Sequence, residues 1–481
     1  MKTKRAAAFF AALILAFSAA TGTLAAAAGT DWPQFLGSPV SPGVTAAKTP
    51  VNAAAAKLVW SEKHTVKSEF NGTTFENNAC GTPITVGKYL YFTVSDGRLL
   101  KLDAATGKTA ASAECKNIPL YFSQIAYGDG KIYVPQQTSS GVQISAFDAD
   151  SLALVWQSEA VVYGETAQQI ASPITYYNGR IYFGTYAQDA KTYAYVSGVY
   201  ACIDAASGKT VWQQQNSTAG YYWDGGAVLG SAIAVADTAG NLTSYRLTDG
   251  VKISSISAGG PVLSTLCSAQ GRLYASVKSG YIYSVKADAN GTLYGSTAVK
   301  SAVLGNSISS SPVVYNGRLY VAGGGYGATT PFSVLDAATL KTVYQIKDIQ
   351  SQSSPLVATA YASDKNKQQV SIYLTKYGTC DQDGVYTKGS SCVYVVKDCA
   401  GQTKASYETL FTPAAQSCTQ SLTVSRDGML YYFNDSGTLY AIGSKPALSS
   451  PATGEAPLAS VATVLVLSGA AALLFRKKSA Y

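Results

Sequence analysis

The chain repeats one short β-rich pattern, and its clearest copy runs from Ser172 to Trp212. Apolar runs in that copy occupy Ile174–Tyr177, Arg180–Gly184, Gly198–Ile203 and Lys209–Trp212. An Asn-Gly dipeptide separates the first two runs, and a Ser-Gly dipeptide precedes the last. Glycine and asparagine tolerate the positive φ that tight hairpin turns require. Each copy therefore predicts four antiparallel strands and no helix.

A second copy, from Ser311 to Tyr344, has nearly the same sequence, and weaker copies bring the count to eight. They begin near Thr82, Gln124, Ser172, Ala227, Ser264, Ser311, Ser354 and Gln420. Their spacing of about 36 to 66 residues is in the range of β-propeller blades. A single four-stranded sheet cannot bury its faces alone, so such copies stack around an axis. We predict an all-β, eight-bladed propeller of four-stranded antiparallel blades, with seven blades as the alternative.

The two ends of the repeat array complement each other. The segment Lys57–Lys63 (KLVWSEK) has the pattern of a fourth strand but precedes the first copy. The last copy supplies only three strands, SLTVS, MLYYFN and TLYAIG. Adding the N-terminal strand to the last blade would remove two open sheet edges. We therefore predict a closed ring.

Composition supports this fold and argues against one class of partner. Tyr (34) and Gly (44) are abundant, as suits strands and turns, and charged residues make up only 13%. Leaving out three basic residues at each end reduces 36 basic residues to 30 against 28 acidic ones, a net of +2. A nucleic-acid-binding face needs clustered basic residues. We find no such cluster and expect no nucleic-acid partner.

The N-terminal region predicts export. Residues 1–28 combine basic residues, an apolar run and small residues that fit a cleavage site, as in a secretory signal peptide. An uncleaved membrane anchor is the alternative. Residues 29–56, rich in Pro, Gly and Ala, are expected to form an extended lead-in to a propeller at 57–443.

The C-terminal region predicts an anchor at the cell surface. A linker at 444–455 precedes an uncharged apolar stretch at 456–475, which is long enough to span a bilayer, and a basic tail at 476–481. The linker contains Pro451, Thr453 and Gly454 in a Pro-Ala-Thr-Gly motif that resembles a cell-wall sorting signal of Gram-positive bacteria. That resemblance implies a sortase-type transpeptidase as partner, although Ser450 stands where the commonest motif has Leu. A plain membrane span is the alternative.

The repeat SP-x-x-x-x-GRLYxG followed by YAxDAx(T/S)GKxxW resembles the quinoprotein-like β-propeller family with PQQ-type repeats, over roughly residues 31–443. In that family an Asp, a turn Gly and a Trp form a motif that docks neighbouring blades. The resemblance implies this role for Asp204, Gly208, Trp212 and Trp156. Other copies depart from the motif: Ala111 stands near the expected Trp in one of them, and Tyr344 replaces it in another.

The resemblance does not extend to the quinone cofactor. Quinone-dependent dehydrogenases of this family resemble one another through adjacent cysteines, a calcium site and a catalytic Asp. No two cysteines are adjacent here, and no matching calcium ligands are evident. We therefore expect no cofactor, no metal and no dehydrogenase activity.

Other catalytic arrangements are poorly supported. The single histidine, His64, lies in the predicted closing strand, which removes most histidine-based schemes. Asp224, Glu165 and Asp381 keep a carboxylate-based reaction formally open, but scattered loop carboxylates are usually solvated turn residues. The segment from Asp381 to Gly384 resembles a calcium loop only faintly, since the later ligands are missing. Among eight cysteines, Cys380 and Cys392 bracket a polar loop and could close it with a disulfide.

Tyr221, Tyr222 and Trp223 form an aromatic group on a predicted loop, with Tyr193, Tyr195 and Tyr200 nearby in sequence. Loop aromatics can stack on sugars or peptide side chains, although they can also cap blade ends. We expect a non-enzymatic, surface-displayed propeller that binds a protein or glycan through its blade loops. The alternative is an extracellular enzyme, either a carboxylate-based lyase or hydrolase or a PQQ-dependent dehydrogenase.

Overall fold

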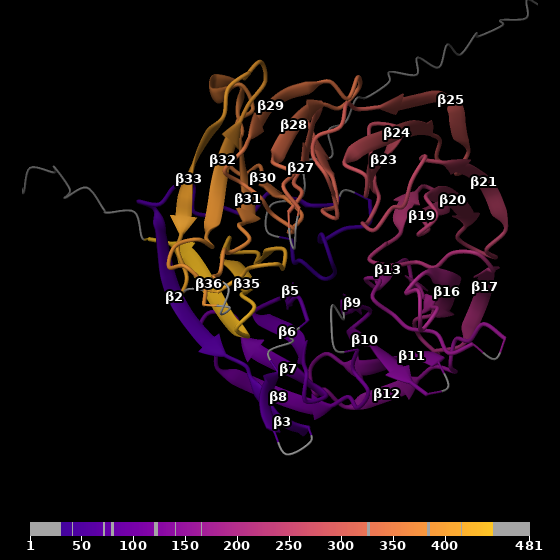
Figure 1. Cartoon of the computed structure of the whole chain (residues 1–481). Helices are drawn as coiled ribbons and strands as arrows, with labels where there is room; N and C mark the ends of the chain where they lie inside the picture. Colours follow the sequence, from indigo (N-terminus) through magenta and orange to yellow (C-terminus); the bar gives the residue numbers. More distant parts are fainter. Residues whose placement is uncertain are drawn as a thin grey trace, which may run out of the picture. The chain divides into compact units, whose positions relative to one another are not determined.

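The computed structural model describes residues 30–445 apart from 41, 71–72, 78–80, 120–123, 140, 165, 325–327, 382–384 and 415. For residues 66–70 and 73–77 it describes the backbone only. Eight antiparallel sheets follow one another along this part of the chain and stand around a common axis (Figure 1).

The first four blades take the chain from residue 84 to residue 257. Blade 1 contains β5 (Ile84–Val86), β6 (Tyr89–Val94), β7 (Arg98–Asp103) and β8 (Thr109–Glu114). Blade 2 contains β9 (Ala126–Gly128), β10 (Lys131–Thr138), β11 (Gly141–Asp148) and β12 (Leu154–Gln157). Blade 3 contains β13 (Thr175–Tyr177), β14 (Arg180–Gly184), the short β15 (Ala187–Gln188), β16 (Tyr195–Asp204) and β17 (Thr210–Asn216). Blade 4 contains β18 (Ala227–Leu229), β19 (Ala232–Ala236), β20 (Asn241–Arg246) and β21 (Lys252–Ser257).

The remaining blades complete the ring. Blade 5 contains β22 (Cys267–Ala269), β23 (Arg272–Val277), β24 (Tyr281–Ala287) and β25 (Leu293–Lys300). Blade 6 contains β26 (Val313–Tyr315), β27 (Arg318–Val321), β28 (Phe332–Asp336) and β29 (Thr342–Ile346). Blade 7 contains β30 (Leu356–Ala358), β31 (Val370–Thr375), β32 (Val393–Asp398) and β33 (Ser406–Phe411), with one 3-10 turn, η1 (Asp364–Asn366). Blade 8 contains β34 (Thr423–Val424), β35 (Leu430–Phe433), β36 (Thr438–Ser444) and β2 (Ala56–Lys63).

The ring closes as predicted from the sequence. Strand β2 pairs antiparallel with β36, so that Trp60 lies opposite Ala441 and Lys63 opposite Thr438. The N-terminal strand thus supplies the outermost strand of the last blade, and the eight-bladed, all-β prediction is confirmed. A two-stranded hairpin, β3 (Val66–Phe70) and β4 (Thr73–Asn77), follows the closing strand.

Each blade runs outward from the axis, and burial decreases in the same direction. Inner strands such as Ala232–Ala236 are buried throughout, whereas outermost strands such as Lys252–Ser257 alternate exposed and half-buried residues. The second strand of every blade except blade 4 carries a buried tyrosine that packs in the core. These residues are Tyr91, Tyr133, Tyr182, Tyr274, Tyr320, Tyr373 and Tyr431. Buried apolar residues of neighbouring blades form a separate cluster at each seam around the ring.

The lead-in, residues 30–55, is an integral part of the propeller. It runs past the innermost strands, where Figure 1 shows its indigo trace in the middle of the ring. Its backbone carbonyls accept hydrogen bonds from one blade after another: Pro33 from Tyr127 at 2.7 Å, and Pro39 from Val228 at 3.0 Å. Strand β1 (Val44–Thr45) then pairs in parallel with β30 of blade 7. The lead-in thereby satisfies backbone groups that innermost strands would otherwise leave unpaired.

Candidate functional site

The segments that precede the innermost strands meet at the axis and surround a cavity of about 60 Å³, here called the axial cavity. All eight blades contribute to its lining. Its polar side chains are Thr82, Gln124, Ser264, Ser309, Ser311, Gln352, Ser354, Thr419, Gln420 and Ser421, and its apolar residues are Phe35, Ala171, Pro173 and Trp223. None of these lining residues is charged. The cavity lies on the side of the ring that carries the connections between blades, which we call the entry face.

Four hydroxyl residues form a hydroxyl belt at the cavity: Thr265, Ser311, Ser354 and Ser421. The three serines line the cavity, and Thr265 follows the lining residue Ser264. The backbone N–H of each of the first three donates to the side-chain oxygen of the next, at 3.0, 3.0 and 2.9 Å. The N–H of Gly225 donates to Thr265 at 3.0 Å and begins the series. A hydroxyl that accepts one hydrogen bond can still donate its own hydrogen. The belt therefore offers donors and acceptors along its side of the cavity.

The lead-in forms the floor of the axial cavity. Phe35 lines this cavity and also a second, smaller one of about 10 Å³, so its ring stands between them. The neighbouring Gln34 fixes the position of Phe35: its carboxamide accepts the N–H of Tyr176 at 2.8 Å and donates to the same residue's carbonyl at 3.4 Å. The cavity is consequently open toward the entry face and closed by the lead-in.

An aromatic cluster of Tyr186, Tyr195, Tyr222 and Trp223 adjoins the axial cavity. The ring centroids of Tyr222 and Trp223 are 4.7 Å apart, and Tyr186 and Tyr195 lie 5.0 and 5.4 Å from Tyr222. Trp223 belongs both to this cluster and to the cavity lining. Tyr222 and Trp223 are half-buried, so part of each ring remains accessible.

The aromatic group expected from the sequence is thus divided by the fold. Tyr221 is buried with 2% of its surface exposed, and its hydroxyl lies 3.5 Å from that of Tyr245. Only Tyr222 and Trp223 of the three are placed to meet a ligand. Tyr186 was missed because it stands alone in the sequence, between β14 and β16, and only the blade geometry brings it to Tyr222.

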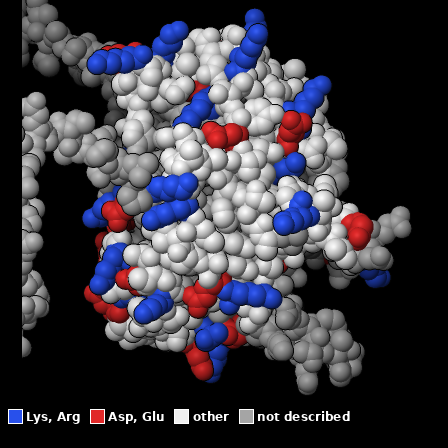
Figure 2. Space-filling model, turned by 90° about the vertical axis from the view of Figure 1, so that its left-hand side faces the viewer, with Lys and Arg blue, Asp and Glu red and all other residues white. Residues whose placement is uncertain are grey.

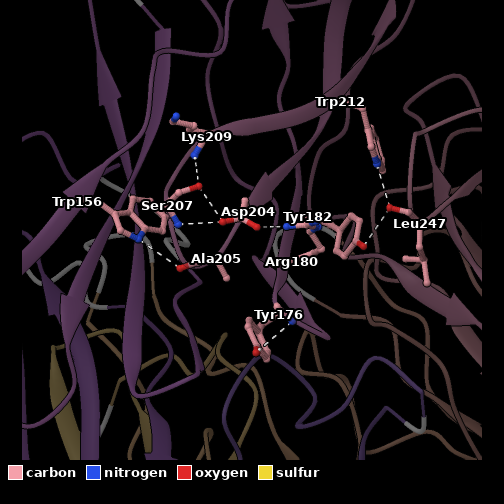
Figure 3. A network of polar contacts seen from close by, with 11 residues as sticks. Trp156, Tyr176, Arg180, Tyr182, Asp204, Ala205, Ser207, Lys209, Trp212 and Leu247 are labelled. Atoms are coloured by element: carbon pink, nitrogen blue, oxygen red, sulfur yellow. Dashed lines mark hydrogen bonds and ion pairs between the residues drawn. The ribbon is translucent and has the colours of Figure 1, made fainter.

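The predicted docking residues lie at seams between blades (Figure 3). Trp156 of blade 2 donates its indole N–H to the carbonyl of Ala205 in blade 3 at 3.2 Å. Trp212 of blade 3 repeats the contact with Leu247 of blade 4 at 3.1 Å. Its ring also leaves no room at the turn glycine of the next blade: a Cβ added to Gly250 would come within 2.5 Å of Trp212.

Trp60, which was not among the predicted docking residues, makes the same contacts between the closing strand and blade 1. Trp60 of the closing strand donates to the carbonyl of Ala104 in blade 1 at 3.0 Å and covers Gly107. Trp156 likewise covers Gly208, where an added Cβ would come within 2.6 Å of its ring. Asp204 caps its own turn, accepting from the backbone N–H of Ser207 at 2.9 Å and pairing with Arg180. The Ser207 hydroxyl, foremost among these contacts, lowers the pKa of Asp204.

Two seams that lack the Trp use other side chains. Between blades 1 and 2, where Ala111 replaces it, Tyr91 and Lys101 both donate to the carbonyl of Ala149, at 2.8 and 3.0 Å. Between blades 6 and 7, Tyr344 donates to the buried carboxylate of Asp398 at 3.0 Å. A backbone carbonyl therefore remains the acceptor between blades 1 and 2, whereas a carboxylate takes its place between blades 6 and 7.

The described catalytic candidates occupy structural positions. Asp224 is fully buried, and its Oδ2 accepts the N–H of Ala236 at 2.6 Å, while desolvation raises its pKa well above 3.8. His64 packs edge-on to Phe92 with ring centroids 5.0 Å apart, and burial lowers its pKa to about 4. Asp381 holds its own loop by accepting the N–H of Val385 at 2.8 Å. Glu165 lies outside the described residues.

In the part of the chain that the structure describes, the cysteines form no disulfide and the possible metal ligands form no cluster. Seven cysteines fall in this part, and all are free, including Cys380 and Cys392, so the disulfide considered between these two is not formed. No group of three or more His, Cys, Asp or Glu side chains in the described ranges is placed to hold a metal ion.

The residues of the axial cavity do not fit pyrroloquinoline quinone. This cofactor carries carboxylate groups, whose recognition requires basic side chains or a bound cation. The lining supplies only hydroxyls, carboxamides and apolar groups. The cavity volume of about 60 Å³ corresponds to on the order of five water molecules, which is small for a fused tricyclic ring system.

Charged side chains are dispersed over the face of the propeller that Figure 2 draws. On the side of the ring drawn in Figure 2, Lys and Arg side chains are interspersed with Asp and Glu, and uncharged surface covers most of the area between them. The predicted signal peptide, sorting motif, apolar span and basic tail all lie outside the described residues. Within those residues, no helix has the length and apolar character needed to cross a membrane.

Comparison with known proteins relates the chain to propellers of two kinds. Residues 121–262 match the family model described as outer membrane protein assembly factor BamB. The structure is similar to BamB from Moraxella catarrhalis, with a TM-score of 0.53 and 13% identity over 80% of this chain and 97% of that one. It is also similar to quinohemoprotein alcohol dehydrogenase from Comamonas testosteroni, with a TM-score of 0.62 and 13% identity over 88% and 82%.

A third similar structure shows how little the fold alone says about activity. The computationally designed protein Ika8 has a TM-score of 0.53 and 10% identity over 77% of this chain and 97% of its own. None of the curated proteins matches the sequence. At these identities the similarities establish the propeller fold, of the type found in BamB and in quinohemoproteins, and leave function to the site.

Proposed function

We propose that the chain is a non-enzymatic binding propeller that holds an extracellular protein or glycan at its entry face. The observation that carries this proposal is the junction of the axial cavity with the aromatic cluster through Trp223. Concave sites that combine aromatic surface with a few convergent polar groups are typical of ligand-binding sites. The match of residues 121–262 to a family model described as an assembly factor also supports a binding role.

A catalytic role has less support from the same residues. Hydrolysis or elimination at a sugar needs a positioned pair of carboxyl groups, and the axial cavity has no carboxyl group in its lining. Of the described carboxylate candidates, Asp224 is fully buried and Asp381 braces its own loop.

Binding is tested by comparing two variants of the intact chain in pulldowns from extracellular protein and glycan fractions. Tyr222→Ala alters the entry face, whereas Tyr294→Ala alters an exposed tyrosine on the outermost strand of blade 5. We expect Tyr222→Ala to lose the captured ligand and Tyr294→Ala to retain it. Equal retention by both variants would move the binding surface away from the entry face.

The enzymatic alternative is tested with the same protein. It is incubated with pyrroloquinoline quinone and calcium, and alcohol- or sugar-dependent dye reduction is measured. We expect no turnover above the rate of protein-free controls. Stoichiometric quinone binding with turnover would replace the binding role by a dehydrogenase.

We also propose that the propeller is exported and displayed at the cell surface through its C-terminal region. What supports this is sequence alone: the apolar stretch at 456–475 and the motif containing Pro451, Thr453 and Gly454. By resemblance, a sortase-type enzyme would cut between Thr453 and Gly454. Mass spectrometry of surface material released by a muralytic enzyme should find chains that end at Thr453. Recovery of peptides from 456–475 in mature, detergent-extracted protein would leave a plain membrane anchor.

A further inference from the structure

We propose that the axial cavity binds one sugar residue at the end of a neutral glycan. This inference rests on the proposed binding function and specifies its ligand. It starts from the uneven distribution of polar and apolar groups around the axis. Blades 3 and 4, together with the lead-in, supply every apolar lining residue, namely Ala171, Pro173, Trp223 and Phe35.

Hydroxyls and carboxamides line the opposite side of the cavity. In a ring of eight blades, blade 7 stands across the axis from blade 3, and blade 8 from blade 4. Blades 7 and 8 contribute Gln352, Ser354, Thr419, Gln420 and Ser421. A ligand on the axis therefore has an apolar wall on one side and neutral hydrogen-bonding groups on the other.

A pyranose ring has the same division of chemistry. One of its faces presents C–H groups, which pack on an indole ring, while its edge presents hydroxyls that both donate and accept hydrogen bonds. The hydroxyls of Ser311, Ser354 and Ser421 can both donate to and accept from a sugar, because each accepts one N–H and still has a hydrogen to donate. The fourth belt hydroxyl, that of Thr265, already donates to the carbonyl of Trp223 at 3.4 Å. Trp223 supplies the indole surface opposite.

The absence of charge among the lining residues selects the class of sugar. A uronic or sialic acid would place a carboxylate in a cavity whose lining contains no Lys or Arg, and the lost hydration would be uncompensated. Neutral sugars exchange water hydrogen bonds for protein hydrogen bonds at much lower cost. The cavity therefore favours neutral glycans over acidic ones.

The size and surroundings of the cavity indicate the end of a chain. Its volume of about 60 Å³ holds on the order of five water molecules, which suits one ring entering from the open side. Phe35 closes the other side, so a glycan cannot thread through the ring. The next sugar would leave the cavity beside Tyr222, whose ring lies 4.7 Å from that of Trp223.

The test measures binding of defined hexasaccharides to the intact chain by titration calorimetry. The neutral probes are β-1,4-linked glucose, mannose, xylose and N-acetylglucosamine chains, and the acidic probe is a galacturonic acid chain. We expect at least one neutral probe to bind and the acidic probe to bind at least about tenfold more weakly. An acidic probe that binds as tightly as every neutral one overturns the inference.

Variants locate the bound sugar. Trp223→Ala should weaken binding of the neutral probe by about tenfold or more, and Ser354→Ala and Ser421→Ala by about threefold to tenfold each. Tyr193→Ala, which truncates an exposed tyrosine of blade 3 outside the cavity lining, serves as the matched control and should change binding less than about twofold. The two serine variants keep the test decisive if Trp223→Ala fails to fold.

The outcomes separate this inference from the function on which it rests. Glycan binding that is lost in Tyr222→Ala but unchanged in the three cavity variants would overturn the axial site and keep the entry face. Capture of a protein but no glycan, lost in Tyr222→Ala, would overturn the sugar and keep the binding function. Ligand binding that depends neither on Tyr222 nor on any of the three cavity residues would overturn both.

Discussion

The seams between blades 3 and 4 and between blades 6 and 7 join equivalent strands by different chemistry. At the first, the neutral indole of Trp212 donates to a backbone carbonyl at 3.1 Å. At the second, the hydroxyls of Tyr344 and Tyr320 donate to Asp398, at 3.0 and 2.9 Å. The geometry of blade stacking is thus shared, but only the second seam contains a buried ionisable acceptor.

The comparison extends to the Asp that ends the third strand of blade 3 and of blade 7. Asp204, which ends β16, caps an exposed turn, and its hydrogen bonds lower its pKa. Asp398, which ends β32, has no exposed surface, and desolvation raises its pKa. One motif position therefore serves a local turn in blade 3 and the contact between blades in blade 7. Five predictions test how far the seams differ.

The largest effect is expected at the closing seam, because it can be removed entirely. Deleting residues 29–63 takes away the lead-in and β2, and leaves β36 as an open edge. We expect loss of the cooperative unfolding transition and strong aggregation, measured by calorimetry and light scattering. A monomeric deletion variant with unchanged thermal stability would contradict ring closure by this strand.

Two glycines with nearly the same backbone conformation separate seam packing from local strain. Gly208 (φ +72) lies under Trp156, whereas Gly317 (φ +75) has no atom within 4 Å of an added Cβ. Gly317→Ala should cost about 1 kcal/mol through its positive φ alone. Gly208→Ala should cost about 3 kcal/mol, because it also displaces the Trp156 ring. Equal losses in denaturant unfolding would show that the ring does not fix this seam.

The closing seam should lose stability in acid because of His64. Burial, with a smaller contribution from Arg98, lowers the pKa of His64 from 6.5 to about 4. Between these two values the unfolded chain binds more protons than the folded one, so stability falls as pH falls. The loss should approach about 3 kcal/mol below pH 4. His64→Gln should flatten this part of the pH profile, and an unchanged slope would assign the acid loss to other groups.

The carboxylate seam should respond to acid in the opposite direction. Tyr344→Phe leaves Asp398 without one of its donors and should cost about 2 kcal/mol at neutral pH. Because the folded-state pKa of Asp398 is raised, the folded protein takes up this proton first as pH falls, and the cost should shrink. Trp212→Phe removes a neutral hydrogen bond and should show a cost independent of pH. Parallel pH profiles for the two variants would erase the distinction between these seams.

The smallest effect is expected between blades 1 and 2. Tyr91→Phe removes one of two donors to the carbonyl of Ala149, and Lys101 remains as the other. The loss should stay under about 1 kcal/mol. Combining it with Lys101→Met should cost clearly more than the sum of the single changes, and simple additivity would show that the two donors act independently.

Sequence periodicity predicted the blades because each hairpin carries its own turn chemistry. The Asn-Gly turn at Asn178 and Gly179 connects β13 and β14, and the orphan segment around Trp60 pairs where expected. These features are local, or repeat often enough to be recognised by comparison within the chain.

The path of the lead-in and the make-up of the axial cavity were not predictable in the same way. Nothing in the sequence around Phe35 indicates that it meets the axis, because its partners come from every part of the chain. The repeated Ser-Pro and Thr-Pro dipeptides predict where innermost strands begin, because they come directly before strands such as β26 and β30. These dipeptides locate the strand starts along the chain, but they do not predict which hydroxyl accepts the backbone N–H of the neighbouring blade.

The pairing of β2 with β36 has a consequence for the order of folding. Trp60 and Ala441 are partners across nearly the whole length of the propeller, so their contact requires a very large loop to close. Contacts of such long sequence separation slow folding, and β2 stays unpaired until β36 has been synthesised. A ribosome or translocation channel that delivers this chain from its N-terminus therefore releases an open arc, and the ring forms only once the final strand has emerged.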